Sequence, residues 1–152
     1  MSDDSSHGET LLIAFDPAPA PETRATLARE INAFNSRTFP YASERFAFLA
    51  HNASGTLQAG VMGAMSWSWL FIEAVWVSDT LRGRGVGRQL MAKAEAHASA
   101  HGCHSVWLDT FQAREFYLAL DYEPFGVLDD YPAGQTRTFM RKRLSAGSTD
   151  SE

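Results

Sequence analysis

The sequence predicts a mixed α/β domain in which a central twisted β-sheet is flanked by helices. Residues 70–77 are apolar, aromatic and β-branched, as expected of a buried strand, and they lead into a glycine-rich turn at 82–87. A helix follows, and residues 105–109 form a second buried strand, which is parallel to the first if the helix is a right-handed crossover. Strand patterns at 46–51 and 57–65 are joined by a short turn and predict an antiparallel hairpin.

Length and composition exclude several classes of protein. The 152 residues suffice for one domain with a sizeable core, which we place at residues 9–144. The net charge of −5 argues against a nucleic-acid partner, and no apolar run is long enough to span a bilayer. The single cysteine, Cys103, excludes an internal disulfide framework, fits a reducing cytoplasm and is expected to be buried. We therefore expect a cytoplasmic protein without nucleic-acid or membrane partners, with disordered polar ends at 1–8 and 145–152.

The remaining elements follow from hydrophobic periodicity. Residues 11–15 predict a first strand, and residues 22–36 predict a helix with one apolar face. The helix after the glycine-rich turn ends before Gly102, the natural residue for a left-handed C-cap. Beyond it, the pattern predicts a short helix at 112–120, a loop at 127–134 and the last strand at 136–144.

The turn that follows the central strand has the composition of a phosphate-binding loop. Glycines let a ligand approach the main chain closely, and the start of the next helix offers free N–H groups and a positive dipole end. Its spacing is neither that of a Walker A loop nor that of a dinucleotide-binding loop. A solvated basic turn with a glycine cap would explain the same residues without a ligand. The candidate phosphate-binding residues are Arg82, Gly83, Arg84, Gly85, Val86, Gly87 and Arg88.

This turn resembles the pyrophosphate loop of the GNAT acyltransferase superfamily. The family pattern is Arg/Gln-x-x-Gly-x-Gly/Ala, and Arg82, Gly85 and Gly87 meet it here. The resemblance implies an acetyl-CoA-dependent N-acetyltransferase of a bacterial subgroup, with acetyl-CoA as its cofactor. It also implies the family's fold, a mostly antiparallel sheet in which one parallel pair of strands splays apart and admits the cofactor. Because family members often dimerise, we expect a homodimer.

A second stretch resembles another GNAT signature, Ala-x-x-Phe-Tyr-x-x-x-Gly-Phe. Ala113, Phe116 and Tyr117 match it, whereas Asp121 and Tyr122 replace the usual glycine and phenylalanine. Aspartate tolerates the left-handed conformation, so the helix can still end at that position.

The resemblance implies roles for residues of this second stretch. In many family members the tyrosine at the position of Tyr117 is the general acid for the departing thiolate, and a phenol has a suitable pKa. The alternative is a core aromatic residue with a satisfied hydroxyl. Thr110 replaces an asparagine that contacts the pantetheine in many relatives. We predict that Thr110, Gln112 and Phe116 help to bind the cofactor.

Acyl transfer to an amine also requires a polarised carbonyl group and a neutral amine. If the central strand is splayed or bulged, backbone N–H groups around Trp76 and Val77 are free to bind the cofactor and to form an oxyanion hole. Glu73 is the candidate general base, because a carboxylate in an apolar strand is costly unless it is used or paired. Pairing with an arginine is the structural alternative.

The predicted function is therefore transfer of an acetyl group from acetyl-CoA to a primary amine of a small molecule, by direct attack in a ternary complex. The alternatives are acetylation of a protein lysine or N-terminus, a non-catalytic CoA-binding regulatory domain, and a structural module. No metal site is expected, because His97 and His101 lack a nearby acidic partner. Asp129 and Asp130 attract an ammonium group or solubilise a turn. The aromatic residues that we assign to an acceptor cleft are Phe39, Tyr41, Trp67, Trp69 and Tyr131.

Overall fold

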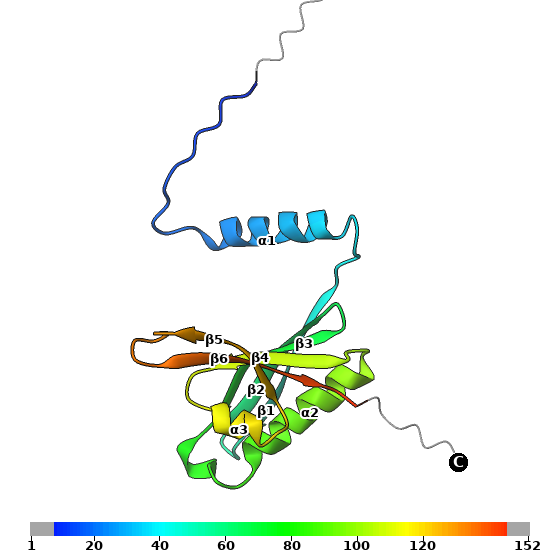
Figure 1. Ribbon diagram of the computed structural model, residues 1–152, viewed down its shortest axis with the longest axis vertical. Coiled ribbons are helices and arrows are strands. Elements are labelled where there is room, and N and C mark those ends of the chain that lie inside the picture. The colour runs from blue at the N-terminus through cyan, green and yellow to red at the C-terminus, as the bar shows by residue number, and fades with distance from the viewer. Residues whose placement is uncertain (1–7, 146–152) are drawn as a thin grey trace, which may run out of the picture. The chain divides into compact units, whose positions relative to one another are not determined.

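The computed structural model describes residues 8–145 and contains two compact units, Met1–Pro40 and Tyr41–Glu152 (Figure 1). The predicted disordered ends at 1–8 and 145–152 lie outside the described residues, except for Gly8 and Ser145. In the described part of the chain, no helix is long and apolar enough to cross a membrane.

The first unit contains the predicted helix, α1 (Pro21–Asn35). Pro21 occupies the first helical turn, where its missing N–H group costs nothing. The predicted strand at residues 11–15 is wrong, because this segment is extended but belongs to no sheet. A strand needs a partner for its backbone groups, and among residues 8–145 no segment pairs with this one. Its apolar side chains are exposed.

The second unit is built on one sheet, which has six strands within the described residues. Their spatial order is β1-β2-β3-β4-β6-β5, and β3 and β4 are the parallel pair in this otherwise antiparallel sheet. This confirms the predicted mixed sheet. The strands are β1 (Ser43–His51), β2 (Leu57–Ser66), β3 (Trp69–Val77), β4 (Ser105–Thr110), β5 (Glu123–Asp129) and β6 (Thr136–Arg143).

Two helices lie on the same face of the sheet (Figure 1). The connection between β3 and β4 supplies the first of them. It consists of a 3₁₀ turn, η1 (Asp79–Leu81), and the crossover helix α2 (Val86–Ala100), while the short helix α3 (Arg114–Leu118) follows β4. Met91 of α2 and Leu70 of β3 are completely buried in the core beneath the sheet. Burial of one such side chain stabilises the fold by about 1.5–3 kcal/mol. Gly102, at φ +88°, adopts the predicted left-handed conformation after α2.

The parallel strands separate soon after they begin. Pairing between β3 and β4 covers Trp69–Phe71 and Ser105–Trp107, and the strands then continue without pairing to each other. The pairing of β3 with β2 shifts register opposite Glu73, which lies between the paired residues Ile72 and Ala74. A bulge at this point bends β3 away from β4. The predicted splay is therefore present, and it opens at the carboxyl ends of both strands.

Two boundaries after β4 differ from the predicted ones. Residues 127–129 were expected in a loop but belong to β5, whose side chains are all exposed because it is an edge strand paired only with β6. An exposed edge strand lacks the alternation of apolar residues that identifies a strand. Helix α3 is shorter than the predicted 112–120, and Asp121 ends the turn after it at φ +69°.

Candidate active site

The glycine-rich turn presents the start of α2 to solvent. Gly83 and Gly85 have φ values of +76° and +74°, and a Cβ added to either would meet no atom within 4 Å. Backbone conformation, not lack of space, therefore requires glycine at both positions. The first N–H groups of α2 have no acceptor within the helix, and the first helical bond runs from Gln89 N–H to the Gly85 carbonyl at 3.0 Å. This geometry suits an anionic phosphate group.

Gly87 has a different role, because it brings three elements of the site together. A Cβ on Gly87 would lie 3.2 Å from Cζ of Phe116 on α3 and 3.8 Å from Cγ2 of Val77 at the end of β3. The missing side chain therefore lets the first turn of α2 pack against both neighbours. As a result, Phe116 and Val77, both predicted to bind the cofactor, lie beside the glycine-rich turn.

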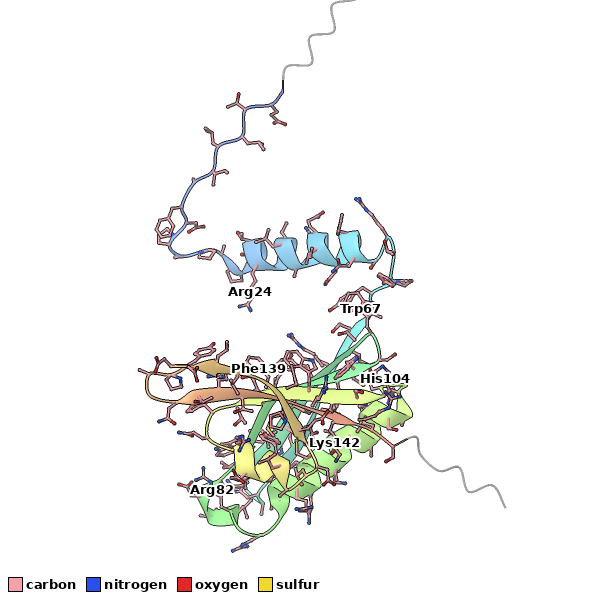
Figure 2. The ribbon with its side chains drawn as sticks, viewed as in Figure 1. Arg24, Trp67, Arg82, His104, Phe139 and Lys142 are labelled. Carbon is pink, nitrogen blue, oxygen red and sulfur yellow. The ribbon has the colours of Figure 1, made fainter. Side chains whose placement is uncertain are left out.

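The three arginines of the turn are not equivalent. Arg82 lies between η1 and α2 (Figure 2), where its Nη1 is 3.0 Å from Asp79 Oδ1 and its Nε donates to the Val77 carbonyl at 3.3 Å. These contacts assign Arg82 to shaping the turn. Arg84 and Arg88 are exposed, and neither forms an ion pair with any described residue. They are therefore the side chains that can supply charge to a bound phosphate.

Tyr117 lies in the core below the splayed strands. Its ring packs against Phe116 and Tyr122, with centroid distances of 5.0 and 5.7 Å. Burial raises the pKa of the Tyr117 phenol, so the hydroxyl remains protonated at neutral pH. Among residues 8–145, none forms a hydrogen bond with this hydroxyl.

Glu73 lies at the bulge of β3, and its side chain faces away from α2. Its Oε1 accepts a bond from Arg45 Nε at 3.0 Å, and Arg45 belongs to the same row across the sheet as Ala64 and Phe71. The predicted alternative, pairing with an arginine, is thus present. Arg45 is mostly exposed, however, and the carboxylate retains free acceptor positions. Glu73 and Tyr117 therefore lie on opposite sides of the sheet.

The backbone near the end of β3 is available for binding. After Phe71, the edge of β3 that faces β4 has no partner strand in the described part of the chain. Alternate N–H groups along this edge, in the segment that includes Trp76 and Val77, therefore lack sheet partners. The Trp76 side chain is half exposed. Such an edge can bind an extended ligand or stabilise negative charge on a carbonyl oxygen.

Thr110 and Gln112 lie at the other rim of the splay. The Thr110 hydroxyl accepts a bond from the Ala113 N–H at 3.0 Å and so caps the turn that leads into α3. Its own O–H remains able to donate. Gln112 is exposed.

The predicted acceptor aromatics are not all brought together. Trp67 and Trp69 line a hollow of about 400 Å³ with Trp107 and Phe125, near the start of β3 and away from the splayed ends. Tyr131 lies at the other end, and its ring covers the guanidinium of Arg137.

Asp130 accepts a bond from the Gly134 N–H at 3.2 Å, which supports the turn interpretation over ammonium binding. Cys103 is buried as predicted, and burial raises the pKa of its thiol. A buried thiol of raised pKa is a poor nucleophile.

One pair at the site was missed. Asp109, two residues after Trp107 on β4, accepts a bond from Arg137 Nη1 at 2.7 Å. The available signal was a carboxylate within a mostly apolar strand, which is also what identified Glu73.

Known proteins resemble this chain in both sequence and structure. The sequence profile of the Acetyltransferase (GNAT) family matches residues 10–122. Blasticidin-S acetyltransferase of Streptomyces morookaense is 36% identical over 104 residues, which are 66% of this chain and 76% of that protein. A solved structure from Agrobacterium tumefaciens has a TM-score of 0.83 at 23% identity, covering 88% of this chain and 99% of that chain.

A further solved structure contains a ligand. An aminoglycoside 6'-N-acetyltransferase complexed with coenzyme A has a TM-score of 0.60 at 18% identity, covering 80% of this chain and 86% of that one. Both solved structures share the fold of this chain. The chain belongs to the GNAT acetyltransferase family, and its fold is the GNAT fold.

Proposed function

We propose that the protein transfers an acetyl group from acetyl-CoA to a primary amine of a small molecule. The observation that carries this proposal is the meeting of the glycine-rich turn, the unpaired edge of β3 and Tyr117 at one end of the sheet. The related protein of 36% identity is named for acetylation of blasticidin S, which favours a small-molecule acceptor.

The turn at the start of α2 fits the anionic end of the cofactor. Free N–H groups, the helix dipole and the side chains of Arg84 and Arg88, which form no ion pair with residues 8–145, offer complementary charge. We assign the rest of the cofactor to the rims of the splay: Trp76 and Val77 on β3, Thr110 and Gln112 after β4, and Phe116 on α3. Acetyl-CoA supplies an acetyl group activated as a thioester.

In the proposed mechanism, Glu73 and Tyr117 transfer protons on opposite faces of the sheet. Glu73, on the face away from α2, accepts a proton from the incoming ammonium group, so that a neutral amine attacks. Free N–H groups near Trp76 and Val77 stabilise the negative charge that develops on the carbonyl oxygen. Tyr117, on the other side, donates its proton to the departing sulfur. The nitrogen loses its second proton to solvent as the amide forms, and Tyr117 regains a proton from solvent. The burial of Cys103 disfavours an acyl-enzyme and supports direct attack.

Calorimetric titration with acetyl-CoA tests the phosphate-binding turn. We expect the wild type to bind and Gly85→Glu to lose binding, because a carboxylate would enter the anion site. Gly55→Glu in the β1–β2 hairpin is a matched control, since Gly55 has a φ of +83° and equally open surroundings. The Gly55→Glu variant places the same charge at a residue with a similarly positive φ, so it should bind acetyl-CoA as the wild type does. A folded wild-type protein that binds no acetyl-CoA would overturn the proposal.

Release of free thiol in the presence of amines tests the reaction itself. The wild type should release CoA only when an acceptor amine is present. Acetylated amine should accumulate in equal amount, as mass spectrometry can verify. Release without an acetylated amine product would mean hydrolysis and would contradict transfer to an amine.

A further inference from the structure

We infer that Asp109, held in place by Arg137, determines acceptor specificity, and that preferred acceptors carry a second cationic group besides the amine that is acetylated. This inference rests on the proposed function, because it concerns the acceptor of that reaction. It adds a residue and a substrate class that the sequence motifs do not specify.

The register of the sheet places Asp109 at the rim of the splay. Phe71 and Trp107 are paired and stacked, with a centroid distance of 4.3 Å, on the face opposite α2. Glu73 and Asp109 each follow two residues later, where the strands have begun to separate. Phe139, which pairs with Asp109 across the sheet, lies on this face, whereas Lys142 lies on the face that carries α2 (Figure 2). The two carboxylates therefore flank the splay on the same face.

Arg137 is held by one ion pair and by two aromatic rings. Its Nη1 donates to Asp109 at 2.7 Å, and its Cζ lies 4.0 Å from the ring centroid of Tyr131 and 5.3 Å from that of Phe111. Its Nε is buried without a hydrogen-bond partner in the described part of the chain. The ion pair with Arg137 and the stacking of Arg137 on Tyr131 together fix the orientation of Asp109.

Asp109, in contrast, keeps unused capacity. A carboxylate has about four acceptor positions, and the hydrogen bond from Arg137 uses one of them. The side chain is 26% exposed, so a ligand can reach it. Half-exposed aromatic rings lie at the same end of the sheet. Phe111 and Tyr131 contact the Arg137 guanidinium, whereas no described cation lies over Trp76 on β3. A free aromatic face at the same rim as a carboxylate favours an organic cation.

A second arginine of β6, Arg141, forms an ion pair that lies on the surface and can be compared with the pair of Arg137 and Asp109. Arg141 Nε lies 2.9 Å from Glu123 Oε1, and Arg141 also covers an aromatic ring, that of Phe125. Those two side chains are 52% and 67% exposed, against 21% and 26% for Arg137 and Asp109. The more buried pair lies at the splay, where an acceptor must enter. The outer pair lies near the start of β4 and provides a matched control.

Calorimetry with two amines of equal length tests the inference. The protein, saturated with CoA, is titrated with 1,5-diaminopentane and with pentylamine, which differ in one ammonium group. We expect the diamine to bind at least about tenfold more tightly, as a charge-assisted hydrogen bond would give. Asp109→Asn should abolish this preference, whereas Glu123→Gln should retain it.

Each result of these titrations either supports or contradicts the inferred role of Asp109. Equal binding of both amines, no binding of the diamine, or a preference that survives Asp109→Asn would overturn the inference. Acetyl transfer is measured separately by thiol release, so that the two proposals can fail independently. Diamine preference without transfer would contradict the proposed function alone, and transfer without diamine preference would contradict the role of Asp109 alone.

Discussion

Glu73 and Arg45 form an ion pair across the face of the sheet that is turned away from α2, with 3.0 Å between Oε1 and Nε. The pair is unequal, because the Arg45 side chain is 77% exposed and that of Glu73 only 19%. A mostly exposed arginine contributes little to stability, typically less than about 1 kcal/mol. The pair therefore offers a way to separate a catalytic from a structural role of Glu73.

Substitution of each partner in turn makes that separation. Glu73→Gln should lower kcat by about 10²–10⁴, as loss of a general base does, while acetyl-CoA binding is retained. Arg45→Gln removes the same ion pair and should have a far smaller effect on kcat. Steady-state thiol release measures both. Equal losses in the two variants would mean that Glu73 serves only to pair with Arg45.

Tyr117→Phe should remove the general acid and leave the fold intact. We expect kcat to fall by about 10²–10⁴ with unchanged acetyl-CoA affinity, because the ring still fills its place in the core. Since burial raises the pKa of the Tyr117 phenol, the wild-type rate should decline on the alkaline side only above about pH 10, the ordinary tyrosine value. Tyr122→Phe, which changes the neighbouring buried tyrosine, is the control. Full activity of Tyr117→Phe would refute the assignment.

Tyr122→Phe is itself expected to leave the protein as stable as before or more stable by up to about 1 kcal/mol. The Tyr122 hydroxyl is buried and has no hydrogen-bond partner among residues 8–145, so its removal relieves a desolvation cost. Denaturant unfolding at neutral pH measures this change. A loss of more than about 1 kcal/mol would show that the hydroxyl has a stabilising partner.

The same substitution has a predictable pH dependence. Burial, then the charge of Glu95, then Tyr117 raise the pKa of Tyr122. A raised folded-state pKa means that the folded protein holds this proton more tightly than the unfolded chain. The stability that comes from this tighter proton binding is therefore fully present below the unfolded pKa of about 10. It is lost as the pH rises above that value. Above pH 10, Tyr122→Phe should lose less stability than the wild type.

The elements around the site were predictable because their signals are local. A buried strand, a glycine-rich turn and a helix face are each specified within a few residues, as at 70–87. The strand predicted at 11–15 failed for the opposite reason: apolar composition does not provide a partner strand. The prediction did not include residues 127–129 in the edge strand β5. All side chains of β5 are exposed, so the strand lacks the alternation of apolar and polar residues from which strands are predicted.

The site was predictable only in part, for a related reason. Gly85 and Tyr117 belong to contiguous motifs, whereas the ion pairs of Glu73 and Asp109 each join residues 28 positions apart. Such pairs are set by strand order and register. No pattern along the chain indicates that β6 lies beside β4, and so the arginine that holds Asp109 could not be named beforehand.

Two glycines of β2, Gly60 and Gly63, allow close packing of neighbouring leucine side chains. Gly63 lies beside the bulge of β3, and a Cβ there would be 2.7 Å from Cδ1 of Leu70, which is completely buried. A Cβ on Gly60 would be similarly close, 2.8 Å, to Cδ2 of Leu49, but Leu49 is half exposed and can move. The matched substitutions therefore differ mainly in the freedom of the neighbouring side chain.

Gly63→Ala should destabilise the protein by about 1–3 kcal/mol, as overpacking of a core does, and should disturb the bulge that bears Glu73. Gly60→Ala should cost clearly less, because the exposed Leu49 side chain can rotate away. Chemical denaturation gives both free energies of unfolding, and thiol release reports on the bulge. If the two variants were equally stable, the close contact between Gly63 and Leu70 would not be what fixes β2 against β3. If Gly63→Ala lost stability but kept full kcat, the position of Glu73 would not depend on this packing.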